Sequence, residues 1–223
     1  MNRVIEIMLG LPKSIVFNFS QLDFNAAVRL PILVSYRTKF KSLKGKIHIE
    51  GQCKTGMIRI GLNGTGSGTA YYKPVVIENN GIIVFQGKVS IGGGCQLCTV
   101  RKDSKLIVGD KSKFMGECHL VAASLVTIGK DCAISWDTQI MDTDFHHIYG
   151  QDGKLLNMDK PVAIGNHVWI GSHSIILKGT ALPDELVIAA GSIISSGSFD
   201  ISEGTVLTGL PARVLKKNIK WEM

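Results

Sequence analysis

Two carboxylates and two adjacent histidines stand close together in residues 142–147, which read DTDFHH. An imidazole titrates near neutral pH, so a histidine here can accept a proton from an attacking hydroxyl or amine. A carboxylate beside the other ring nitrogen would orient the ring and favour its protonated form. His146 and His147 are therefore candidate general bases, and Asp142 and Asp144 are either orienting groups or residues that shape a surface turn.

The sequence on the C-terminal side of this stretch repeats every six residues. From residue 164 it divides into IGNHVW, IGSHSI, ILKGTA, LPDELV, IAAGSI and ISSGSF, and every hexad opens with an aliphatic residue. An α-helix would rotate such residues around its surface, whereas an even spacing with Gly, Asn, Asp and Ser in between suits short strands and turns. We therefore predict an all-β solenoid in which three hexads close one triangular coil. The inward positions are Ile164, Ile170, Ile176, Leu182, Ile188 and Ile194.

The hexad pattern cannot continue through residues 142–161. The inward positions there would be His146, Asp152 and Met158. A charged aspartate in a narrow apolar core costs several kcal/mol unless it is paired. We therefore predict that this segment leaves the solenoid as a long loop, and long structured loops in compact domains are often functional.

Composition and charge narrow the classes of function. The chain carries 25 Lys and Arg against 18 Asp and Glu, a formal net charge of +7. Its basic clusters at 37–46 and 213–220 are not interleaved with aromatic residues, which disfavours binding to nucleic acid. The clusters are better explained as solvated surfaces or as contacts to the phosphates of a ligand. Five cysteines without a secretory signal favour the cytoplasm, and no apolar run reaches the about 18 residues of a membrane span. The basic N-terminal third also suits peripheral contact with the inner membrane.

The hexads, together with PVAIGNHVWIGS at 161–172, resemble the hexapeptide-repeat acyltransferase superfamily over roughly residues 90–217. The resemblance implies a left-handed parallel β-helix. We assign it to residues 46–208, after a mixed N-terminal segment at 1–45 with strand-like patterning and before a basic C-terminal tail at 209–223.

The same resemblance, closest to the sugar and capsular polysaccharide O-acetyltransferase branch, implies a reaction. An acetyl group would pass from acetyl-CoA to a hydroxyl of a sugar or polysaccharide precursor. His146 matches the family's general base, and His147 stands where relatives often have a small residue. The family arrangement further implies a homotrimer with sites between subunits and without a metal. Carried over by position, the residues that would contact the coenzyme are Trp169, Ser172, Ala190, Ser195, Arg213 and Lys216. Ser196 stands where relatives have a lysine, and Lys178 is a candidate to supply that phosphate contact.

Three other functions are weighed against this one. An N-acetyltransferase acting on a sugar-nucleotide amine or another small acceptor would use the same parts. A non-catalytic β-helix scaffold is possible because fold does not imply function, but it would need no histidine in the loop. A zinc-dependent hydratase on this fold requires one histidine and a close His-x4-His pair. Neither His119 with His146 or His147, nor His167 with His173, supplies that spacing.

Overall fold

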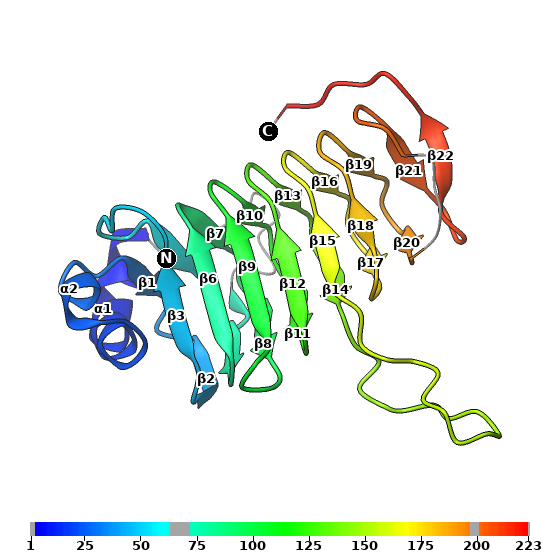
Figure 1. The fold of residues 1–223 in the computed structure, drawn as a ribbon. Helices are drawn as coiled ribbons and strands as arrows, with labels where there is room; N and C mark the ends of the chain where they lie inside the picture. Colours follow the sequence, from blue (N-terminus) through cyan, green and yellow to red (C-terminus); the bar gives the residue numbers. More distant parts are fainter. Residues whose placement is uncertain (1–2, 63–71, 197–200, 223) are drawn as a thin grey trace.

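The computed structural model describes residues 3–62, 72–196 and 201–222 and forms a three-sided solenoid (Figure 1). We name its three sheets faces A, B and C. Face A contains β1 (Ile32–Val34), β4 (Ile58–Ile60), β7 (Val89–Ile91), β10 (Lys113–Phe114), β13 (Ala133–Ile134), β16 (Trp169–Ile170), β19 (Val187–Ile188), β21 (Val206–Thr208) and β22 (Arg213–Lys216). Face B contains β2 (Lys39–Leu43), β5 (Val76–Asn79), β8 (Gln96–Thr99), β11 (His119–Ala122), β14 (Gln139–Met141), β17 (Ile175–Ile176) and β20 (Ile193–Ile194). Face C contains β3 (Lys46–Ile49), β6 (Ile82–Gln86), β9 (Lys105–Gly109), β12 (Leu125–Ile128), β15 (Val162–Ile164) and β18 (Ala181–Leu182).

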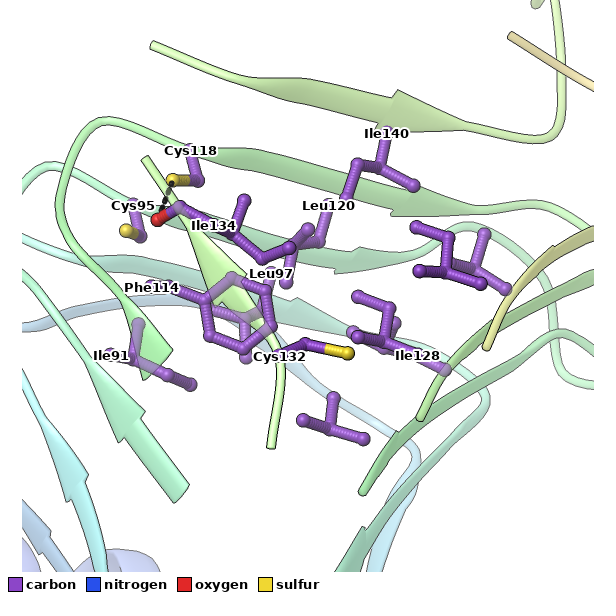
Figure 2. Close-up of a cluster of buried hydrophobic side chains, with 14 of the residues drawn as sticks. Ile91, Cys95, Leu97, Phe114, Cys118, Leu120, Ile128, Cys132, Ile134 and Ile140 are labelled. Carbon is purple, nitrogen blue, oxygen red and sulfur yellow. Dashed lines mark hydrogen bonds between the residues drawn. The ribbon is translucent and has the colours of Figure 1, made fainter. Parts of the chain in front are cut away.

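Each coil stacks on the next by parallel backbone pairing, so equivalent side chains form ladders along the interior. On face A, Phe114 pairs with Ile91 in one coil and with Ile134 in the next. On face B, Leu120 lies between Leu97 and Ile140 in the same way. Figure 2 shows these side chains gathered in one cluster in the interior of the solenoid. The predicted inward residues of all six hexads from 164 to 194 are at most 5% exposed, which confirms the three-sided solenoid.

Glycines at the turns let neighbouring coils approach closely. A side chain at Gly109 would place its Cβ 2.4 Å from the backbone carbon of Gly129, and one at Gly129 would lie 2.4 Å from the carbonyl oxygen of Gly165. Both distances are too short for any real Cβ contact. The glycines of the repeat therefore allow the tight stacking that brings equivalent turns of successive coils together.

The N-terminal segment corrects part of the sequence interpretation. It forms α1 (Arg3–Gln21) and α2 (Phe24–Ala27), which cover the first coil, instead of the predicted strand-like structure (Figure 1). A continuous apolar run does not reveal by periodicity alone whether it is helix or strand. The solenoid also begins at β1, before the predicted boundary at residue 46, because the early coils lack regular hexads.

The C-terminal end folds back onto face A. β21 continues that face in parallel with β19, and β22 then runs antiparallel to β21. The predicted basic tail therefore contains the last strand of the sheet. Within the described residues, no helix is both long and apolar enough to cross a bilayer.

Candidate active site

The predicted loop leaves the solenoid between β14 on face B and β15 on face C (Figure 1). Its described backbone contains one isolated antiparallel bridge, between Tyr149 and Leu155, and no regular strand. The coils on both sides nevertheless keep their registers, since β12 pairs directly with β15. The prediction of an excursion over residues 142–161 is thus confirmed, and the parallel strand pairing of the solenoid continues after the loop.

Asp142 anchors the start of the loop. Its side chain is fully buried, and its carboxylate accepts hydrogen bonds from the backbone N–H groups of Ala123 (2.6 Å), Ser124 (2.7 Å) and Leu125 (2.6 Å). These three amides form the turn between β11 and β12 in the preceding coil. Both carboxylate oxygens are thereby occupied, and no hydrogen bond in the described structure joins Asp142 to the His146 ring. The geometry makes Asp142 a structural cap on that turn.

Asp144 belongs to a network that fixes the backbone on either side of Phe145. Its Oδ2 accepts from Lys178 Nζ at 2.6 Å and from Asn157 Nδ2 at 2.9 Å. Asn157 Nδ2 also donates to the carbonyl oxygen of His146 at 2.8 Å, and the His146 N–H donates to the Asp144 carbonyl at 2.7 Å. The hydrogen bond from Lys178 lowers the pKa of the Asp144 carboxyl below its ordinary value, with Asn157 adding to the shift.

Lys178 is a member of this network. Its ammonium also donates to the Asn157 carbonyl at 2.7 Å, and its side chain is only 17% exposed. Lys178 was predicted to meet coenzyme phosphates, whereas its observed contacts are with the loop. Asn157 was missed from the sequence, because an amide 11 residues beyond His146 in an irregular loop carries no recognisable pattern.

The two histidines have different surroundings. Both side chains are exposed. The His147 ring lies edge-on to Tyr149, with ring centroids 6.1 Å apart. The His146 ring makes no hydrogen bond to any described residue, while its backbone is held on both sides by Asp144 and Asn157. His146 therefore combines a fixed backbone with a ring that is free to meet a substrate.

A small cavity lies beside this turn. Phe145, which adopts a left-handed backbone conformation (φ 61°), closes a cavity of about 270 Å³ against the outside of face B. Val121 and Cys98 contribute to its wall, and the Lys41–Glu78 ion pair (2.7 Å) lies at its edge. Burial raises the pKa of the Cys98 thiol to about 11. The cavity is thus mainly apolar with a charged margin, next to the candidate base.

Cys95 and Cys98, which have the CxxC spacing in the sequence CQLC, lie in separate environments. Cys95 is fully buried in the solenoid core, where Figure 2 shows it among aliphatic side chains, whereas Cys98 lines the outer cavity. Among the described residues, no three His, Cys, Asp or Glu side chains gather as they would to hold a metal ion.

The predicted coenzyme residues lie at both edges of face B and on strands of face A. Ser172 and Ala190 lie at its edge with face A, where the Gly191 N–H donates to the Ser172 carbonyl at 2.9 Å. Ser195 lies at the edge with face C, in the turn after β20. Trp169 lies on face A, 42% exposed, and donates from Nε1 to Ser135 Oγ at 3.2 Å. The exposed Arg213 and Lys216 belong to β22.

A larger cavity, of about 680 Å³, lies along the edge between faces C and A. Its wall includes His167, whose Nδ1 is 2.6 Å from Glu185 Oε2 and whose ring stacks on Trp221 with centroids 4.0 Å apart. This histidine is already paired and packed, so the cavity lacks a free base. Four lysines contribute to its wall, namely Lys88, Lys111, Lys113 and Lys130.

Comparison with known proteins identifies relatives among sugar acetyltransferases. The sequence is 31% identical over 137 residues to the polysialic acid O-acetyltransferase of Neisseria meningitidis, covering 60% of this chain and 55% of that protein. It thus spans little more than half of that relative's length. It is 30% identical over 206 residues to an uncharacterized 24.8 kDa protein in the cps region of Klebsiella pneumoniae, covering 92% of this chain and 87% of the relative. No protein-family model matches the sequence.

Two solved structures share the fold. The polysialic acid O-acetyltransferase OatWY superposes with a TM-score of 0.56 at 27% identity, over 83% of this chain and 91% of that one. The polysialic-acid-specific acetyltransferase NeuO gives a TM-score of 0.62 at 22% identity, over 86% and 79%. Both have the left-handed β-helix, so the predicted fold class is confirmed.

Proposed function

Because the chain belongs to the hexapeptide-repeat acetyltransferase family, we propose that it transfers an acetyl group from acetyl-CoA to a hydroxyl of a sugar or polysaccharide precursor. The observation that carries this proposal is the exposed His146 ring on a backbone fixed by Asp144 and Asn157. An imidazole held in this way is suited to remove a proton from an acceptor hydroxyl.

His146 acts as the general base of a direct transfer. Acetyl-CoA supplies a thioester whose carbonyl carbon accepts the acceptor oxygen and whose sulfur leaves. His146 takes the hydroxyl proton as the new C–O bond forms. The imidazolium then returns that proton to the departing sulfur when the C–S bond breaks, so the base ends neutral. The products are a sugar acetate and free coenzyme A.

The residues present fit acetyl-CoA in two respects. Arg213 and Lys216 are exposed cations on one strand, which suits phosphate groups. Ser172 and Ala190 are small and lie in adjacent turns, which leaves room for a narrow chain. Within one subunit, these turns lie on the opposite edge of face B from the loop that carries His146. A complete site therefore needs the loop of one subunit and the turns of another.

This division between two edges supports a homotrimer with three shared sites. Light scattering of the purified protein tests the assembly. A trimer is expected, and a stable monomer that retains full activity would contradict the shared site.

We assign the acceptor to the cavity under Phe145, which adjoins the candidate base. The relatives named above support a sugar hydroxyl as the acceptor. An amine on a sugar nucleotide would use the same base, and this N-acetyltransferase reaction is the second candidate. A cytoplasmic location is part of the proposal, supported by five cysteines that are all free.

The test is a measurement of free thiol released from acetyl-CoA in the presence of sugar and glycan acceptors. Release that depends on the acceptor is expected. A product acetyl group lost in mild base identifies an ester, whereas a base-stable product identifies the N-acetyltransferase. A pure protein that neither binds acetyl-CoA nor releases thiol would instead be a scaffold.

Lys178→Met separates positioning from coenzyme binding. If Lys178 tethers the loop, kcat falls by about tenfold or more, because misplacing a base by even 1 Å is costly, while KM for acetyl-CoA stays nearly constant. If Lys178 met a coenzyme phosphate, KM for acetyl-CoA would rise. Lys154→Met is the matched control, since Lys154 forms an exposed ion pair with Asp152 (2.9 Å) in the same loop.

The same tether predicts a dependence on pH. Lys178 lowers the pKa of Asp144, so the ion pair is fully present above the ordinary carboxyl pKa and is lost as the pH falls through the depressed value. In Lys178→Met the ion pair is absent at every pH, so the loop should already be loose at neutral pH and should change less across the acidic range than in the wild type. Hydrogen exchange of the loop amides across the acidic range measures this difference.

A further inference from the structure

The N-terminal helix α1 places polar side chains inward and apolar side chains outward, the reverse of an ordinary surface helix. Asn18 donates to the Ile32 carbonyl at 2.7 Å and accepts from the Ile32 N–H at 3.2 Å. Ser14 Oγ accepts from the Val34 N–H at 2.9 Å. Side chains of α1 thereby satisfy the outer edge of β1, which would otherwise be an open sheet edge. The buried polar residues of α1 are Glu6, Ser14, Asn18 and Gln21.

The outward face of α1 is an apolar surface without exposed charge, and α2 adds Phe24 and Val28 to it beside the exposed polar residues Asp23, Asn25 and Arg29. Among residues 4–20, every residue classed as exposed is apolar except Ser20. Lys13 is drawn back onto the carbonyl oxygens of Tyr36 (2.6 Å) and Thr38 (2.8 Å). Soluble monomers rarely expose an apolar surface of this extent unless it binds something. Its members, 39% to 71% exposed, are Val4, Ile5, Met8, Leu9, Leu11, Ile15, Val16, Phe19, Phe24 and Val28.

The net positive charge of the chain is concentrated in the N-terminal part that contains this surface. Residues 1–60 hold ten Lys and Arg and three Asp and Glu, whereas residues 61–223 hold 15 of each, so the whole formal net charge of +7 lies in the first 60 residues. Lys39, Lys44 and Lys46 are exposed on the first coil, and Lys46 donates from Nζ to the Ser20 carbonyl at the end of α1 at 3.3 Å. An apolar surface bordered by cations matches the acyl chains and anionic headgroups of a membrane leaflet.

We propose that the outer face of α1 and α2 docks on an anionic lipid bilayer, with α1 lying in the plane of the interface. The helix of 19 residues is about 28 Å long and does not span the membrane. A protein partner fits less well, because protein interfaces mix hydrogen-bonding groups into their apolar area and the exposed side chains of α1 at residues 4–20 offer only Ser20.

Docking at this end orients the rest of the molecule. The loop follows β14, four coils beyond β2 on face B, which is about 19 Å from the first coil at the spacing of paired strands. Resting on the proposed function, this geometry holds His146 within reach of a glycan that is still attached to a membrane lipid. Membrane docking itself is independent of that function and can be tested without turnover.

The experiment is flotation of the full-length protein with two kinds of vesicle, phosphatidylcholine alone and phosphatidylcholine containing phosphatidylglycerol. The wild type should float with the anionic vesicles and bind the neutral ones at least tenfold more weakly. Met8→Glu/Val16→Glu should lower anionic binding by more than tenfold, since both side chains leave water on docking. Leu210→Glu, which alters a similarly exposed residue at the far end of the solenoid, should bind like the wild type.

Charge is tested separately, with a variant that leaves the helices untouched. Lys39→Gln/Lys44→Gln should weaken binding by about fivefold per lysine at low salt, and the difference should shrink in high salt. Lys102→Gln/Lys105→Gln, further along the solenoid, is the matched control. A wild type that stays unbound, or a helix variant that floats like the wild type, overturns the proposal. The proposal is also overturned if light scattering shows that Met8→Glu/Val16→Glu dissociates an assembly that the wild type forms, because the face would then be a protein interface.

Discussion

Replacing His146 by alanine is expected to lower kcat for acetyl transfer by about 10²–10⁴-fold while leaving the affinity for acetyl-CoA nearly unchanged. The imidazole removes a proton only in the transition state, so its loss removes little ground-state binding. Its exposed ring makes no hydrogen bond to the described protein, and truncation should therefore also leave folding stability nearly unchanged. Steady-state kinetics, equilibrium binding of acetyl-CoA and thermal unfolding measure the three quantities.

His147→Ala is the matched control, because it removes the same side chain one residue along the loop. His147 contacts Tyr149 edge-on and lies outside the hydrogen bonds that hold the backbone around Phe145. We expect kcat to stay within a few-fold of the wild type. Full activity in His146→Ala, or a loss in His147→Ala of equal size, would reverse the assignment of the base.

The sequence predicts the solenoid because one simple constraint operates in every coil. Each flat side needs an aliphatic residue pointing inward, and this constraint recurs from Ile164 to Ile194 without any contact distant in sequence having to be known. The loop was predictable from the same rule, because Asp152 cannot occupy a narrow apolar interior. Both results depend on local pattern alone.

The contacts within the site were not predictable in this way. Lys178 carries the side chain expected of a phosphate ligand, and only the stacking of β17 beside β14 shows that its ammonium reaches Asp144. The helix α1 was misassigned for a related reason. Its inward residues, such as Asn18, are polar because they hydrogen-bond to the edge of β1. The usual rule that apolar residues face the core therefore does not identify this helix.

These contacts give the solenoid a direct part in the proposed chemistry. The coils on either side of the loop hold it, the preceding one through the turn amides bound by Asp142 and the following one through Lys178. The base is therefore positioned by the same parallel stacking that builds the core. A weakened anchor should lower activity even when no substrate contact is lost.

Asp142→Ala is expected to cost about 3 kcal/mol or more in the free energy of unfolding, because three backbone N–H groups in the turn at 123–125 lose their acceptor. Each buried donor left without a partner costs about 1–3 kcal/mol, and water entering the turn would recover part of the sum. Urea denaturation measures the loss. Asp152→Ala, which alters an exposed aspartate of the same loop, should change stability by less than about 0.5 kcal/mol.

Asp142→Asn distinguishes this structural cap from an orienting group for the base. The amide keeps one acceptor oxygen but turns an NH₂ group toward backbone donors, so stability should fall, though by less than in the alanine variant. Activity should then recover when the temperature is lowered and the anchor is restored. A variant as stable as the wild type but inactive at every temperature would show that the Asp142 charge acts on His146. It would contradict the structural role that the hydrogen bonds to the turn at 123–125 indicate.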